Sequence, residues 1–241
     1  MGASSWIAAI LATVFAVTLG LRLPRLLKGS GNLWLWLTHL AMTVALCLVV
    51  EPIYLFVDRL MGSMNLANLF SHFCINLVFF AGGTQVALSA GRKDVVARIR
   101  VLSATLLPVC LALMTVLFFV ADLSYSDMGL NTFRSQDNVV VLYKLVLYIY
   151  PAIISSLLVR PLLQAAADSV HLLPYYSRRL MAVGTALVVV SPMGHLAELA
   201  NRQLNWVTDI LVYPAILLVL VGATLGYIST WRLRQKISRA D

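Results

Sequence analysis

The chain has 241 residues, of which 61% are hydrophobic and only 12% are charged. A soluble domain carries about 25% charged residues, so the composition predicts an integral membrane protein and excludes an ordinary soluble enzyme. The formal net charge of +8 comes from basic residues in short segments between apolar stretches. That placement is typical of membrane topology, and we expect no nucleic-acid partner.

Seven apolar segments are long enough to cross a bilayer, which requires about 20 residues of α-helix. Charged residues, or breaks that contain Pro, Gly or Asn, separate neighbouring segments. The pattern predicts an all-α membrane protein in which a single bundle of seven transmembrane helices takes up residues 1–241, without a sizeable soluble domain. The predicted spans are 6–23, 33–57, 66–88, 101–120, 139–159, 181–200 and 206–230.

Basic residues fall almost entirely on one side of this pattern. Of the 18 Lys and Arg residues, fourteen lie in segments that would share one side, three lie in segments on the other, and Lys144 lies within a span. Cytoplasmic loops carry an excess of basic residues, so we expect the N-terminus outside and the C-terminus in the cytoplasm. Trp6 and Trp206 at outer boundaries and Trp34 at an inner boundary agree with this orientation.

Polar and ionisable side chains recur at helical spacing inside these apolar segments. His72 and Asn76 are four residues apart in one span, and Lys144 and Tyr148 have the same spacing in another. A charged side chain at the bilayer centre costs at least about 2.5–3.5 kcal/mol, so such residues indicate candidate functional sites. With the expected topology they gather toward the outer end of the bundle and predict one polar cavity there. Its candidate residues are Glu51, His72, Asn76, Lys144, Tyr148, His195, Glu198, Asp209 and Tyr213.

This polar layer allows several interpretations. A structural network of interhelical pairs is one, in which Lys144 pairs with Glu51, Glu198 or Asp209. A cavity for a small polar or zwitterionic ligand is another. It predicts a receptor-like sensor or a small-solute permeation protein that needs no cofactor. A third is a non-catalytic membrane scaffold or regulatory protein that binds a protein partner through its cytoplasmic loops.

A metal-dependent hydrolase within the membrane is the enzymatic alternative. His195 and Glu198 are three residues apart on one helix face, so together with His72 they are the residues expected to hold a metal ion if one is present. The chain has no HExxH motif and no Gly-x-Ser-x-Gly motif, which favours a non-enzymatic role.

Two further segments predict packing or an interface. Gln164, Asp168 and His171 form a polar stripe within 161–174, which indicates either an interfacial helix or a cytoplasmic extension of the preceding span. Gly222 and Gly226 form a GxxxG pattern that predicts close helix packing, within the bundle rather than between subunits.

The stretch from Val57 to His72 resembles the beginning of the third span in a group of actinobacterial multi-span membrane proteins, transporters of unknown function. The resemblance covers about sixteen residues together with the number of spans. It implies a multi-pass protein of a bacterial plasma membrane. It implies no substrate and no catalytic residue.

Overall fold

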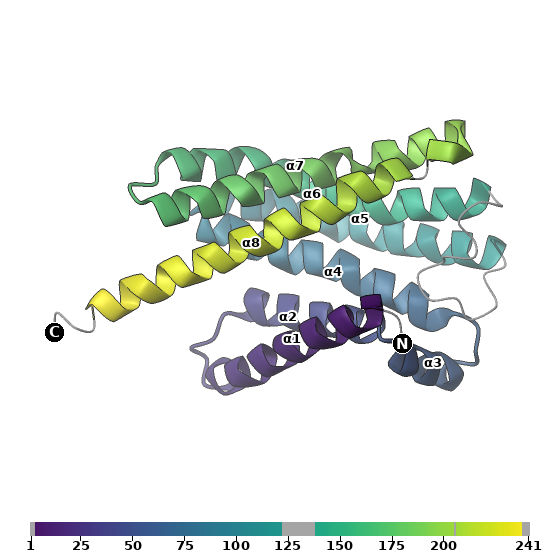
Figure 1. Cartoon of the computed structure of the whole chain (residues 1–241), viewed down its shortest axis with the longest axis horizontal. Helices are drawn as coiled ribbons and strands as arrows, with labels where there is room; N and C mark the ends of the chain where they lie inside the picture. The colour runs from purple at the N-terminus through teal and green to yellow at the C-terminus, as the bar shows by residue number, and fades with distance from the viewer. Residues whose placement is uncertain (1–2, 122–137, 205, 238–241) are drawn as a thin grey trace. The chain divides into compact units, whose positions relative to one another are not determined.

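The structure, a computed structural model, describes residues 3–121, 138–204 and 206–237. Every regular element within these ranges is helical (Figure 1). In chain order the elements are α1 (Ala3–Leu27), α2 (Leu33–Cys47), α3 (Glu51–Leu60), α4 (Leu66–Ser89), α5 (Lys93–Val120), α6 (Asn138–Ala167), α7 (Leu172–Ala200), the 3₁₀ turn η2 (Arg202–Leu204) and α8 (Trp206–Ile237).

Six helices in the described part of the chain are long and apolar enough to cross a membrane, namely α1, α4, α5, α6, α7 and α8. The pair of α2 and α3 meets the same criteria only when the two are taken together, although they are bent by 94°. The chain therefore has the architecture of a multi-span helical membrane protein. The expected orientation of its termini stays a prediction.

The second predicted span, 33–57, is not one continuous helix, and the count of seven spans stays a prediction. The chain is extended at Val50, between α2 and α3. Pro52 explains the break, because in a continuous helix its ring would clash with the carbonyl of Leu48 and its missing N–H would remove a hydrogen bond. In α3 it lies in the first turn, where no intrahelical N–H bond is needed. Prolines of three other spans remain inside uninterrupted helices: Pro151 in α6, Pro192 in α7 and Pro214 in α8.

A buried carboxylate holds the turn between α3 and α4. Asp58 is fully buried, and its two carboxylate oxygens accept hydrogen bonds from the backbone N–H groups of Asn65 and Ala67, at 3.2 and 3.3 Å. The first N–H groups of a helix have no acceptor within that helix, so Asp58 supplies one for the start of α4. The Tyr54 hydroxyl donates to the Asn65 side chain from the same face of α3.

The segment 161–174 contains the end of α6, a turn and the start of α7. Because α6 continues to Ala167, the structure has the extension of a span and not a separate interfacial helix. The Arg178 guanidinium donates to the Ala165 carbonyl and, at 2.7 Å, to the Ser169 hydroxyl. Arg178 thus satisfies a carbonyl in the last turn of α6, which has no intrahelical donor.

Close contacts divide the chain into two compact units. Unit 1 comprises Met1–Gln85 and Ala97–Tyr150, and unit 2 comprises Val86–Val96 and Pro151–Asp241.

Aromatic and polar contacts join the helices of unit 1. Trp34 of α2 packs edge-on against Phe80 of α4, with ring centroids 5.4 Å apart. The Ser103 hydroxyl of α5 is hydrogen-bonded to the Tyr150 hydroxyl of α6 at 2.7 Å, and both residues are buried. Edge-to-face aromatic pairs add about 0.5–1.5 kcal/mol beyond the area that they bury, so these rings help to fix the helix pairs.

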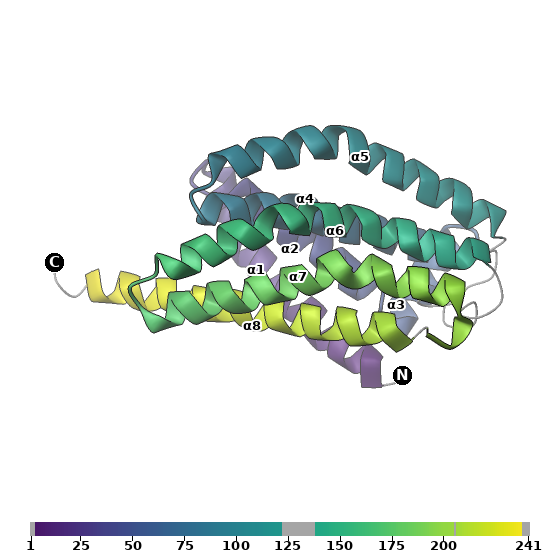
Figure 2. The same ribbon diagram turned by 90° about the horizontal axis from the view of Figure 1, so that it is seen from above.

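Small residues join α7 to α8 in unit 2, where the two helices run side by side (Figure 2). A Cβ atom added at Gly184 or Gly222 would lie within 3.0 Å of backbone atoms of the facing helix. The Ser177 hydroxyl of α7 donates to the carbonyl of Gly222 at 2.7 Å, and a Cβ at Gly226 would meet the same hydroxyl at 2.8 Å. Gly222 and Gly226 therefore let the two backbones approach within one chain.

Substitution of Gly222 tests this contact. Gly222→Ala should lower the free energy of unfolding by about 1–3 kcal/mol, because the added methyl group would meet α7 backbone atoms that cannot move aside. Gly20→Ala in α1 is the matched control, since nothing lies within 4 Å of its added Cβ. SDS-induced unfolding followed by circular dichroism measures both variants. Equal stability of the two would contradict the close approach of α7 and α8.

Removal of the Asp58 carboxylate tests the α3–α4 turn. Asp58→Ala leaves two buried N–H groups without an acceptor, and we expect a loss of about 1–3 kcal/mol in the free energy of unfolding. Asp58→Asn keeps one acceptor oxygen and should lose less. Asp94→Ala, which removes an exposed ion pair with Arg92, serves as the control and should have little effect. If Asp94→Ala destabilises the protein as much as Asp58→Ala, the capping role is refuted.

Candidate functional site

The polar face of α4 meets α6 at His72 within unit 1. Nδ1 of His72 is hydrogen-bonded to the Tyr143 hydroxyl at 2.7 Å, and the two ring centroids are 5.6 Å apart. Tyr143 is fully buried, whereas His72 is half-buried. This pair forms a polar connection between two helices that are otherwise rich in apolar residues.

One turn further along α4, Asn76 is fully buried. Its Nδ2 donates to the backbone carbonyl of His72 at 3.0 Å and lies 3.8 Å from the sulfur of Met114. Its Oδ1, however, has no hydrogen-bond partner among the described residues. A buried acceptor without a donor costs free energy, and most such groups in folded proteins are paired. Asn76 therefore presents an acceptor that suits a small polar molecule or a water.

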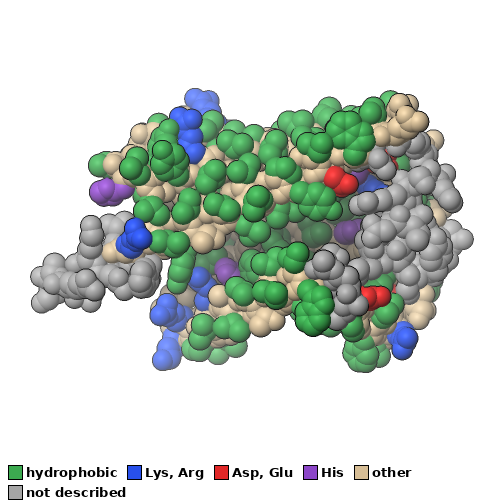
Figure 3. Space-filling view, viewed as in Figure 1, with side chains coloured by type: hydrophobic (Ala, Val, Ile, Leu, Met, Phe, Trp, Pro, Cys, Tyr) green, Lys and Arg blue, Asp and Glu red, His purple; other side chains and the backbone are tan. Residues whose placement is uncertain are grey.

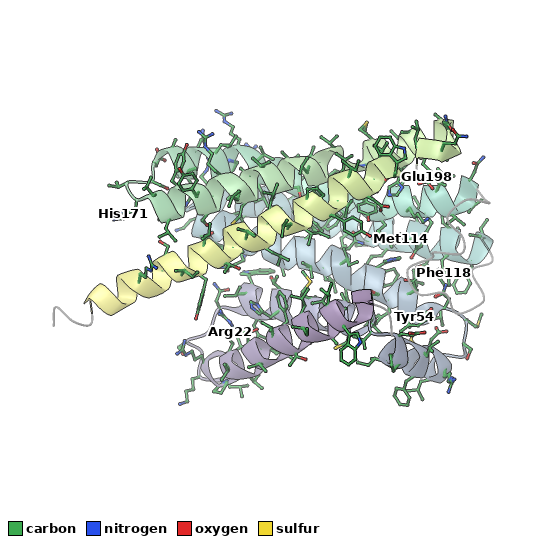
Figure 4. All side chains as sticks on the ribbon, viewed as in Figure 1. Arg22, Tyr54, Met114, Phe118, His171 and Glu198 are labelled. Carbon is green, nitrogen blue, oxygen red and sulfur yellow. The ribbon has the colours of Figure 1, made fainter. Side chains whose placement is uncertain are left out.

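Apolar side chains of α5 border this position. Met114 and Phe118, labelled in Figure 4, are both buried. Met114 contacts the Asn76 amide, and the ring of Phe118 lies 6.2 Å from that of Tyr143. The polar groups thus lie beside an apolar wall, an arrangement common in small-molecule sites.

Lys144, the residue that follows Tyr143 on α6, adds a positive charge beside this pair. Lys144 is half-buried and interacts electrostatically with His72. Tyr148, one turn further along α6, is also half-buried. We call His72, Asn76, Tyr143, Lys144 and Tyr148 the α4–α6 polar face. It combines a cation, two phenols, an amide and an imidazole within unit 1.

Unit 2 holds a second polar group near the end of α7, where Figure 4 labels Glu198. Nδ1 of His195 lies 3.2 Å from Oε2 of Glu198, and each residue is only 3% exposed. Gly194 leaves room beside them for the α8 residue Thr208, because a Cβ there would come within 2.5 Å of its hydroxyl oxygen. The sequence spacing of His195 and Glu198 thus corresponds to a direct contact.

The structure also describes the positions of the remaining predicted site residues. Glu51 is exposed as the first residue of α3, because the chain turns between α2 and α3. Tyr213 is 63% exposed on α8, and Asp209 is half-buried in the first turn of that helix. The predicted residues belong partly to unit 1 and partly to unit 2, and the single outer cavity stays a prediction.

The sequence prediction missed Tyr143, Met114 and Thr208. In the sequence, Tyr143 and Met114 look like ordinary apolar residues of a span. The only sequence signal near Tyr143 is the adjacent Lys144. Thr208 follows Trp206 at a predicted boundary and shows no helical stripe of its own. Thr208 lies beside the α7 polar residues because α7 and α8 approach each other closely at Gly194.

Metal ligation was predicted for His72, His195 and Glu198 in the event that the site binds a metal. Only His195 and Glu198 are shown in contact. Within the described part of either unit, no three His, Cys, Asp or Glu side chains are grouped closely enough to hold a metal ion.

Comparisons with known proteins add no relative of this chain: no protein-family model, no curated protein and no solved structure matches it. The site is therefore interpreted from its own geometry.

A double-mutant cycle tests the connection between α4 and α6. Tyr143→Phe and His72→Phe each remove one partner of the hydrogen bond, and we expect a coupling energy of about 0.6 kcal/mol, typical of polar pairs between transmembrane helices. The measurement is the free energy of unfolding in mixed micelles. The control cycle combines Tyr143→Phe with Thr13→Val, an exposed α1 position, and should be additive. Additivity in both cycles would show that the His72–Tyr143 bond contributes nothing to stability.

Proposed function

We propose that this chain is a non-enzymatic multi-span plasma-membrane protein that binds a small polar solute at the α4–α6 polar face, as a receptor-like sensor or a solute permeation protein. The observation that carries the proposal is the fully buried Asn76, whose Oδ1 has no partner in the described part of the chain. A purely structural polar network would be expected to satisfy this group.

The chemistry of the face favours a solute that carries both charge signs. The Lys144 ammonium attracts a carboxylate or another anion. The Asn76 carbonyl oxygen accepts a hydrogen bond from an ammonium or an amide. The phenols and the imidazole can donate or accept. Small zwitterions such as amino acids fit this donor and acceptor set, and the buried Met114 and Phe118 suit a short apolar side chain.

The orientation of the protein forms part of the proposal. Fourteen of its 18 basic residues belong to segments expected on one side, which supports a cytoplasmic C-terminus. In that orientation the start of α4 lies toward the outside, so the α4–α6 polar face would receive its solute from the outer compartment. The resemblance of Val57–His72 to bacterial multi-span proteins supports a bacterial plasma membrane.

The metal hydrolase is not the function that we favour. Its proposed ligands come from both units, and only His195 and Glu198 are in contact. A hydrolytic zinc site needs three protein ligands, and the described residues of neither unit contain such a group of three.

Ligand-dependent stability tests the proposed function. The full chain in neutral detergent is heated with glycine, alanine, glutamate or acetate, each at millimolar concentration. A solute present at 100 times its Kd should stabilise the protein by about 2.7 kcal/mol, which appears as a rise in Tm. Lys144→Met and Asn76→Leu should abolish the rise for the same solute.

Thr13→Val is the control, because this exposed threonine lies outside the α4–α6 polar face and should leave the Tm shift unchanged. Uptake of the stabilising solute into proteoliposomes then separates permeation from sensing. Absence of a Tm shift with all four solutes, or a shift that persists in both site variants, would refute binding at this face.

A further inference from the structure

Basic side chains gather in unit 2 where α6 ends and α7 begins. In Figure 3 some of the Lys and Arg side chains are visible at this end of α7, while the middle of the helix is mostly hydrophobic. His171, labelled in Figure 4, marks the turn between the two helices. The basic residues of unit 2 near this turn are Arg92, Lys93, Arg160, Arg178 and Arg179.

Two of these arginines hold the local structure together. Arg92 donates to the Gln164 side chain of α6 at 2.6 Å and pairs with both carboxylate oxygens of Asp94. The Asp94 hydrogen bonds raise the pKa of the Arg92 guanidinium, so its charge is retained. Arg178 caps the end of α6, as described above. Both side chains are thus occupied by protein groups.

The other three cations are exposed, and we call Lys93, Arg160 and Arg179 the basic rim. Among the described residues, Lys93 and Arg160 have neither a hydrogen-bond acceptor nor an ion-pair partner. The Arg179 guanidinium lies over the Tyr175 ring, 5.1 Å from its centroid. It keeps its charge there, because a cation–π contact does not neutralise it.

Two hydrogen bonds place the basic rim at one end of unit 2. Gln164 follows Arg160 by four residues, so both lie on one face of α6, and the bond from Arg92 brings the neighbouring Lys93 toward that face. The contact of Arg178 with the Ala165 carbonyl sets the register of α7. Arg179 is the next residue and therefore belongs to the same end of α7, beside the last turns of α6 that follow Arg160.

The length of α6 places this rim at the surface of a membrane. The 30 residues of α6 extend about 45 Å, more than the ~30 Å of a hydrocarbon core. Its apolar part ends just before Arg160, and the apolar part of α7 begins just after Arg179. Tyr176 of the same end is 54% exposed, as is common for tyrosine at the headgroup level. The exposed Asp168 in the turn is the one carboxylate between Arg160 and Arg179.

We propose that the basic rim binds the headgroup phosphate of an anionic phospholipid such as phosphatidylglycerol. Guanidinium groups bind phosphate oxygens in a bidentate manner, and Lys93 adds a point charge. A zwitterionic lipid has the same phosphate but carries a cation that the three basic side chains repel. Binding at the rim does not depend on the solute proposed for the α4–α6 polar face.

Native mass spectrometry of the full chain in neutral detergent tests this site, with phosphatidylglycerol and phosphatidylcholine as probes. The wild type should bind phosphatidylglycerol more tightly than phosphatidylcholine. The variant Arg160→Gln/Arg179→Gln should lose about thirtyfold in affinity for phosphatidylglycerol. This corresponds to about 2 kcal/mol for two basic residues near an anionic lipid surface.

Arg25→Gln is the control outside the rim, because it removes one exposed arginine of α1 in unit 1 and should change the affinity less than threefold. Arg160→Lys/Arg179→Lys keeps both charges and should retain the preference for phosphatidylglycerol, which guards against a loss caused by misfolding. Equal affinity of the wild type for the two lipids would overturn the proposal. So would an equal loss in the Arg25→Gln variant, or displacement of the lipid by millimolar inorganic phosphate.

Discussion

In a helix that crosses a bilayer, each backbone N–H and C=O group has to find its partner within its own segment, because the hydrocarbon offers none. This constraint explains where side chains intervene in the structure. Asn32 accepts from the Leu35 N–H at the start of α2, Asp58 serves the start of α4, and Arg178 serves the end of α6. Each lies where a helix begins or ends, and each replaces a partner that the helix itself cannot supply. At these three helix ends, side chains of the chain itself therefore satisfy backbone groups that the helix leaves without a partner.

The two units satisfy a second requirement, close packing without a hydrophobic driving force, in different ways. Unit 2 brings the α7 and α8 backbones together at Gly184 and Gly222. Unit 1 instead uses large rings and polar pairs, such as Trp34 with Phe80 and His72 with Tyr143. The His72–Tyr143 pair places polar groups between α4 and α6. This difference is one reason why the candidate solute site belongs to unit 1.

Hydropathy and helical spacing were sufficient to predict the six long helices and the contact of His195 with Glu198. They did not predict the break between α2 and α3 at Pro52. Hydropathy does not distinguish this proline from Pro151 or Pro192, which remain inside continuous helices. Its different effect depends on the chain being able to turn at Val50 and on Asp58 capping the helix that follows. Tyr143 was missed for a related reason. A buried tyrosine reads as apolar until a partner from another helix is known, and sequence spacing cannot supply a contact across 71 positions.

The hydrogen bond from Ser177 to the Gly222 carbonyl restricts how α7 and α8 can move. Sliding of one helix along the other would break this hydrogen bond. It would also disturb the packing of Met181, whose side chain already fills the space beside Gly222. These contacts oppose a change in the axial register of α7 and α8, so we expect the two helices to move as one unit. Any piston-like or rotary motion that accompanies a functional cycle has to carry both helices together, with the strain taken up at the ends of the hairpin.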